Sequence, residues 1–135
     1  MNIHILSNSP IRINSGFGVV CRNLSLELSK LGHNVSVSNM QGIYDIEYWN
    51  NIVIYPLNSV GGASGNSFYT NEVQQFIRNL KDSKAELVLI IYPCYDDALV
   101  LNRLHEIHPN TYWYYPCEFE NIPANYIKEL KKVKI

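Results

Sequence analysis

The strongest constraint on the fold is an amphipathic helix, predicted over residues 16–31, that lies between two short apolar stretches. Its apolar residues recur three or four positions apart, which places them on one face of a helix. Gly32 follows at the position where a glycine in the left-handed conformation ends many helices. Residues 2–7 and 34–40 are short and contain regularly placed Ile, Leu or Val, so each is predicted to be a strand. The apolar face of the helix consists of Phe17, Val20, Cys21, Leu24, Leu28 and Leu31.

The alternation of strand and helix continues along the chain. The run at residues 86–92 is continuously apolar, as in a parallel strand that is covered on both faces. Strands separated by amphipathic helices predict an α/β, Rossmann-like, doubly wound parallel sheet with strand order 3-2-1-4-5. The aromatic and acidic residues 41–51 are interpreted either as a loop over a ligand cleft or as a surface hairpin. Further strands are predicted at 52–57 and 111–115, and further helices at 70–82, from 96 to before Pro109, and from Pro123 onward.

Length and composition indicate one domain and exclude several classes of protein. A chain of 135 residues, of which 47% are hydrophobic and 17% charged, has the size and apolar content of a single globular domain. With 11 Lys+Arg against 12 Asp+Glu, it lacks the basic excess typical of nucleic-acid binders. No apolar run approaches the ~20 residues that span a bilayer, and no signal peptide is recognisable, so a cytoplasmic location is expected. The cysteines show neither metal-ligand nor disulfide spacing and are expected to be packed thiols: Cys21, Cys94 and Cys117.

Residues 14–18 (Asn-Ser-Gly-Phe-Gly) form the turn between the first strand and the first helix, where ligands bind in open α/β sheets. Two glycines let a ligand approach the backbone, and the helix N-terminus offers unpaired N–H groups, which suits a phosphate or a sugar hydroxyl. The alternative interpretation is a tight turn that needs glycine only for its backbone. A dinucleotide fingerprint is excluded by Cys21 at its third small position and by Asn39 or Met40 at the end of the second strand. The Gly/Ser-rich segment 61–67 lacks the Gly-Lys-Ser/Thr ending of a P-loop.

Several motifs, in chain order, resemble the N-terminal domain of GT-B fold glycosyltransferases, in particular the retaining family 4. In these enzymes two Rossmann-like domains face each other across a cleft; the N-terminal domain binds the acceptor and the C-terminal domain binds most of the nucleotide sugar. The resemblance extends over nearly the whole chain. The motifs are the N-terminal strand, Ser15-Gly16-Phe17-Gly18-Val19-Val20, Arg22-Asn23-Leu24, Leu31-Gly32-His33-Asn34-Val35 and Tyr115-Pro116-Cys117-Glu118.

The resemblance implies that residues 1–135 are the acceptor-side domain of a transferase that moves a sugar from a nucleotide-diphosphate sugar to an acceptor hydroxyl. Donor phosphate or sugar contacts fall on Ser15, Gly16, Phe17 and Gly18, with Ser15 also capping the helix and Phe17 holding it down. The reaction needs no metal or cofactor in this family. The family's donor-binding elements belong to a C-terminal domain and are absent from these residues, so the implied partners are such a domain, in cis or trans, and the two substrates. The chain alone is expected to be inactive, and a peripheral membrane contact through the acceptor stays open.

Candidate acceptor-binding residues follow the fourth and fifth strands: Tyr92, Asp96 and Glu118. The histidine that many family members carry after the fourth strand is missing here, and Asp96 equally suits a helix cap. Glu118 is interpreted either as a ligand of an acceptor hydroxyl or as a solvated loop carboxylate. The aromatic run at 112–115 is read as core, with alternate rings lining a sugar cleft as the second interpretation.

Two further expectations remain. His105 and His108, three residues apart, are interpreted as favourable charges at a helix C-terminus rather than as a metal pair, because no third ligand is indicated. A non-enzymatic module that binds a sugar, a nucleotide or a protein at the same glycine turn is the alternative function, since a fold alone does not define an activity.

Overall fold

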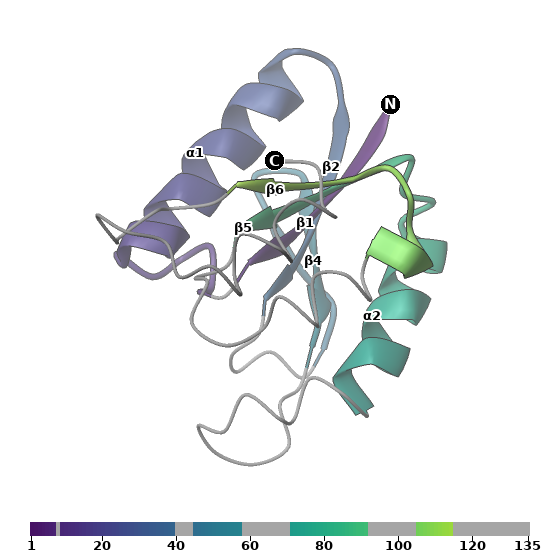
Figure 1. Ribbon diagram of the computed structural model, residues 1–135. Helices are drawn as coiled ribbons and strands as arrows, with labels where there is room; N and C mark the ends of the chain where they lie inside the picture. Colours follow the sequence, from purple (N-terminus) through teal and green to yellow (C-terminus); the bar gives the residue numbers. More distant parts are fainter. Residues whose placement is uncertain (8, 40–44, 58–70, 92–104, 115–135) are drawn as a thin grey trace, which may run out of the picture.

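Strands and helices alternate in the computed structural model, which describes residues 1–7, 9–39, 45–57, 71–91 and 105–114 (Figure 1). Within these residues, the two long helices are α1 (Gly16–Lys30) and α2 (Asn71–Asp82), and residues 105–107 are also helical. The strands are β1 (Asn2–Ser7), β2 (Asn34–Asn39), β3 (Glu47–Trp49), β4 (Ile52–Pro56), β5 (Leu87–Ile91) and β6 (Thr111–Tyr114).

All six strands belong to one sheet, in the order β3-β4-β2-β1-β5-β6. Every neighbouring pair is parallel except β3 and β4, which are antiparallel. The chain leaves β1 through α1 toward β2 and later returns through α2 to β5, on the other side of β1 (Figure 1). The two helices cover opposite faces of the sheet, so the predicted α/β, doubly wound architecture compatible with a Rossmann-like fold is confirmed.

The predicted strand order 3-2-1-4-5 differs from the observed one because the sheet has a sixth strand at its edge; the five predicted strands keep their order, as β4-β2-β1-β5-β6. That strand, β3, lies in the aromatic and acidic segment that the sequence left undecided, and it pairs with β4 as a hairpin. Asn50 and Asn51 join the two strands, and both have positive φ, of 46° and 64°. Two such residues make the type of tight turn that matches the twist of a hairpin, and Asn tolerates it better than most residues. The surface-hairpin interpretation therefore holds for residues 47–56.

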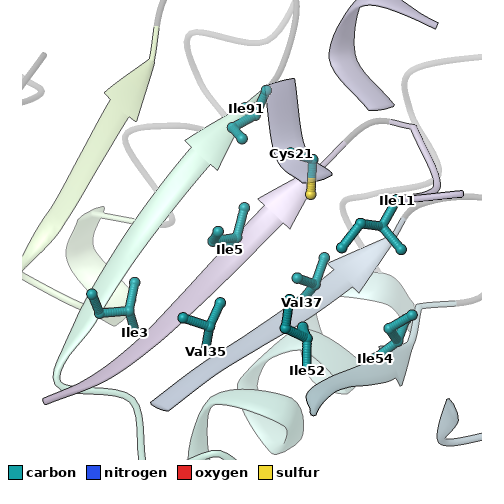
Figure 2. Close-up of a cluster of buried hydrophobic side chains, with 9 residues drawn as sticks. All are labelled: Ile3, Ile5, Ile11, Cys21, Val35, Val37, Ile52, Ile54 and Ile91. Carbon is teal, nitrogen blue, oxygen red and sulfur yellow. The ribbon is translucent and has the colours of Figure 1, made fainter. Parts of the chain in front are cut away.

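The face of the sheet under α1 is formed mainly by a cluster of apolar side chains (Figure 2). Successive strand residues point to opposite faces, so Ile3 and Ile5 of β1 lie with Val35 and Val37 of β2 beneath the helix. Ile11, from the loop after β1, completes this layer. Packed against it are Phe17, Val20, Leu24 and Leu28 of α1, which belong to the predicted face. Leu31, predicted on the same face, is instead the C-cap of α1 and is exposed.

The face under α2 combines apolar side chains with a buried polar network. His4 of β1 is fully buried; its Nδ1 lies 2.7 Å from Ser36 Oγ and its Nε2 lies 2.8 Å from Ser38 Oγ. Asn79 of α2 donates from Nδ2 to Ser38 Oγ and to the Pro56 carbonyl, at 2.9 Å each. Each of these buried groups therefore has a partner, and the hydrogen bonds tie α2 to three strands.

Candidate functional site

The candidate site lies at the carboxyl edge of the parallel strands, where the loop after β1 leads into α1. Because α1 and α2 carry the chain in opposite directions from the centre of the sheet, the ends of β1 and β5 flank the point where the strand order reverses. Open α/β sheets bind their ligands outside the strand ends at such a point. The structure describes the β1 side of this point, residues 9–15 and the first turn of α1.

Ser15 is the N-cap of α1, as expected. Its backbone is extended (φ −94°, ψ 162°), its Oγ accepts a hydrogen bond from the Gly18 amide at 3.1 Å, and its carbonyl accepts one from the Val19 amide at 2.9 Å. In the described part of the chain, no hydrogen bond engages the amides of Gly16 and Phe17. These two N–H groups, at the positive end of the helix dipole, are the ones that remain for an anion.

The structure requires glycine at only one of the two glycine positions of the turn. A Cβ on Gly18 would lie 2.2 Å from the Ile13 carbonyl oxygen and 2.9 Å from that of Pro10, so the loop itself requires glycine there. A Cβ on Gly16 would meet nothing within 4 Å, and Gly16 is exposed. The tight-turn interpretation therefore accounts for Gly18 but not for Gly16. Phe17 packs against the core cluster under α1, as the resemblance implied.

Two arginines border the turn, and the sequence analysis assigned neither of them a role. Arg22, on the second turn of α1, places Nη1 and Nη2 each 3.3 Å from Asn14 Oδ1, so the side chain lies along the loop. Arg12, inside the loop, forms an ion pair with Glu47 at 3.0 Å and donates to the Tyr48 carbonyl at 3.3 Å. The first turn of α1 contains no acidic residue. The local charge is therefore positive on the side where the helix dipole is also positive.

Asn39 ends β2 beside the end of β1 and was missed as a candidate. It is fully buried, and neither its Oδ1 nor its Nδ2 has a hydrogen-bond partner among the described residues. Ser7, its register neighbour on β1, uses its Oγ to donate to the Ser9 carbonyl at 2.8 Å. A buried polar group without a partner costs about 1–3 kcal/mol, so Asn39 requires an explanation. The only sequence signal is a polar residue that ends a buried strand at the ligand edge.

Cys21 lies behind the turn, in the core beneath α1, and is chemically inert there. It is fully buried, and burial raises its pKa to about 11, so the group is a neutral thiol at physiological pH. The expectation of a packed thiol is met for this residue. Cys94 and Cys117 lie outside the described residues.

The remaining candidates divide between described and undescribed parts of the chain. Tyr92, Asp96 and Glu118 lie outside the described residues, so their acceptor-binding role stays a prediction. In the aromatic run, Trp113 is buried and Tyr114 is exposed, as the alternation of a strand requires.

The expectations about metal binding and membrane spanning can be compared with the structure only within the described ranges. His108 Nε2 lies 3.1 Å from the Ala85 carbonyl oxygen, a contact that makes this nitrogen the proton-bearing one. Among the residues with described positions, no group of three or more His, Cys, Asp or Glu side chains could hold a metal ion. No helix in the described ranges is long and apolar enough to cross a bilayer.

Comparison with known proteins adds no assignment. No protein-family model matches the sequence, and no curated protein matches it at a significant level.

Proposed function

We propose that the chain is the acceptor-side domain of a glycosyltransferase that uses a nucleotide-diphosphate sugar. In the reaction, the anomeric carbon forms a bond to an acceptor hydroxyl oxygen while its bond to the diphosphate breaks. The hydroxyl proton is lost and the nucleoside diphosphate leaves. The share of this domain is to position the substrates and to exclude water from the cleft.

One observation carries the proposal: the exposed N-terminus of α1 at the carboxyl edge of the parallel strands. Gly16 and Phe17 present amides there, Gly16 is open to an approaching group, and Arg22 adds positive charge beside the loop. Backbone amides at a helix N-terminus with a nearby cation favour a phosphate oxygen. The motifs around the turn and the doubly wound sheet support a GT-B domain as the context of this site.

The experiment changes Gly16, where a carboxylate is expected to raise the stability of the protein and to weaken the binding of a phosphate. Gly16→Asp places a carboxylate at the positive end of α1, which stabilises the helix by about 0.3–1 kcal/mol but repels a phosphate. Gly16→Ala is the matched control, because the added methyl group meets no atom within 4 Å. Amide shifts of the ¹⁵N-labelled chain are followed by NMR during titration with uridine diphosphate glucose and with inorganic phosphate.

We expect both ligands to shift the amides of Gly16 and Phe17 in the wild type and in Gly16→Ala. In Gly16→Asp we expect a higher melting temperature and binding weakened about tenfold, since one repulsive contact of this kind is worth about 1.4 kcal/mol. If neither ligand shifts these amides, or if Gly16→Asp binds both ligands as well as the control does, the proposed site is wrong. If inorganic phosphate binds but uridine diphosphate glucose does not, the result favours the non-enzymatic binding module.

A further inference from the structure

Asn39 differs from the other buried polar residues of the sheet. On the α2 face, His4, Ser36, Ser38 and Asn79 all have hydrogen-bond partners within the protein. Asn39 is equally buried, yet neither end of its amide has a partner in the part of the chain that the structure describes. Buried polar groups in folded proteins are almost always paired, so an amide with two unpaired ends indicates a function other than stability.

The backbone places this amide at the ligand edge. Asn39 is the last residue of β2, and by alternation it lies on the α1 face with Val35 and Val37. Its register neighbour Ser7 is the last residue of β1, immediately before the loop that leads to α1. Because the Ser7 hydroxyl proton is donated to the Ser9 carbonyl, Ser7 cannot supply the donor that Asn39 Oδ1 lacks.

The chemistry of an amide selects the kind of group that can pair with it. Asn39 offers a donor at Nδ2 and an acceptor at Oδ1. A phosphate only accepts and would leave Oδ1 unpaired, whereas neighbouring hydroxyls both donate and accept. In dinucleotide-binding sheets, the residue near the end of the second strand hydrogen-bonds a ribose hydroxyl, so a polyol at this position fits the geometry of such a sheet.

We infer that Asn39 is a specificity residue that hydrogen-bonds the hydroxyls of a sugar whose phosphate lies at the N-terminus of α1. The inference rests on the proposed function, because it adds the sugar to the anion site. Asn39 has no exposed surface in this structure, so the residues that cover it move when the sugar binds.

The test separates the hydroxyls from the phosphate with three probes. The ¹⁵N-labelled chain is titrated with α-glucose 1-phosphate, with inorganic phosphate and with methyl α-glucoside, and the side-chain amide signal of Asn39 is assigned by its loss in Asn39→Leu. We expect α-glucose 1-phosphate to shift both the Asn39 side-chain signal and the Gly16 amide. We expect inorganic phosphate to shift Gly16 alone, and methyl α-glucoside to shift Asn39 weakly.

Variants then separate recognition from packing. Asn39→Leu replaces the unpaired amide by an apolar group of similar size, so we expect an unchanged or higher urea midpoint together with about tenfold weaker binding of α-glucose 1-phosphate. Its affinity for inorganic phosphate stays the same. Asn79→Leu, the control, removes a paired amide on the other face; we expect a lower urea midpoint and unchanged binding.

Two results would overturn the inference: an Asn39 side-chain signal that no hydroxyl-bearing probe shifts, or equal affinity of Asn39→Leu and the wild type for α-glucose 1-phosphate. If Gly16 still responds to phosphate in either case, the proposed function stands without Asn39. If α-glucose 1-phosphate shifts Asn39 and leaves Gly16 unchanged, the hydroxyl contact stands and the phosphate site at α1 is wrong.

Discussion

The two long helices in the described part of the chain are attached to the same sheet by different means. α1 lies on an apolar cluster (Figure 2). Its first turn approaches the preceding loop so closely that Gly18 cannot carry a side chain. α2 is attached through Phe76 and Leu80, which are buried, and through Asn79, which hydrogen-bonds to β2 and β4. Apolar packing tolerates small shifts, whereas a hydrogen-bond network fixes one arrangement. We infer that hydrogen bonds fix the position of α2 on the sheet, whereas close packing fixes the position of α1.

The largest effect is expected where the first turn of α1 packs closely against the preceding loop. Gly18→Ala adds a Cβ at 2.2 Å from the Ile13 carbonyl oxygen, a clash that only backbone movement relieves. We expect a loss of about 3 kcal/mol in the free energy of unfolding, measured by urea denaturation. Gly16→Ala is the control and is expected to change stability by no more than about 1 kcal/mol. Equal stability of the two variants would show that the close approach does not hold α1 in place.

The buried hydrogen-bond network under α2 is expected to make the stability of the protein depend on pH, through His4. Burial lowers the pKa of His4 to about 3, below its ordinary value of 6.5. Between these values the unfolded chain binds a proton that the folded protein excludes, so stability falls as the pH falls, by about 1.4 kcal/mol per pH unit. Above pH 6.5 both states are neutral at His4, and this residue adds no slope.

The measurement is the free energy of unfolding as a function of pH, in the wild type and in His4→Gln. We expect the wild type to lose about 2 kcal/mol between about pH 6.5 and about pH 4.5 from this residue, and the variant to lack that part of the slope. His33→Gln leaves the buried network intact and is the control. An acid slope that is the same in His4→Gln as in the wild type would contradict the assignment.

A smaller effect is expected for the serine at the centre of the network. Ser38→Ala removes the partner of His4 Nε2 and one of the two partners of Asn79 Nδ2, so we expect a loss of about 2 kcal/mol. Ser36→Ala removes one hydrogen bond to His4 and is expected to cost about half as much. Thermal or urea unfolding measures both, and equal costs would show that Ser38 does not connect the helix to the strand.

The smallest effect on stability is expected at the C-terminal ends of the two helices. Both helices end in the same hydrogen-bond pattern, with the left-handed position occupied by Gly32 after α1 (φ 87°) and by Lys84 after α2 (φ 51°). A side chain is strained in this conformation, so Lys84→Gly is expected to raise the free energy of unfolding by about 1 kcal/mol. Gly32→Lys is the matched reverse change and should lower it by about as much. A destabilised Lys84→Gly would show that the lysine side chain stabilises the end of α2 by more than the strain costs.

Much of the fold could be predicted from the sequence because the signals are local. The apolar stripe of α1, its end at Gly32 and the five parallel strands all follow from spacings of two or three to four residues. The edge strand β3 could not be predicted, since a strand of three residues shows too little periodicity and its pairing depends on the turn at Asn50 and Asn51. The turn at Ser15 was recognised, but the different roles of Gly16 and Gly18 depend on which carbonyl groups approach them in space.

By itself, the sequence determined most of the elements and the faces they bury, and it predicted a ligand site at the first glycine turn, because hydrophobic periodicity and helix capping act over a few residues. Only the tertiary structure decided which polar groups meet. His4 finds its serines 32 and 34 residues away, and Asn79 meets Ser38 across 41 residues. Asn39 has no partner within the described ranges, although the sequence does not distinguish it from any other polar residue at the end of a strand. Hydrogen bonding over such separations depends on how parallel strands are brought into register, which no local pattern encodes.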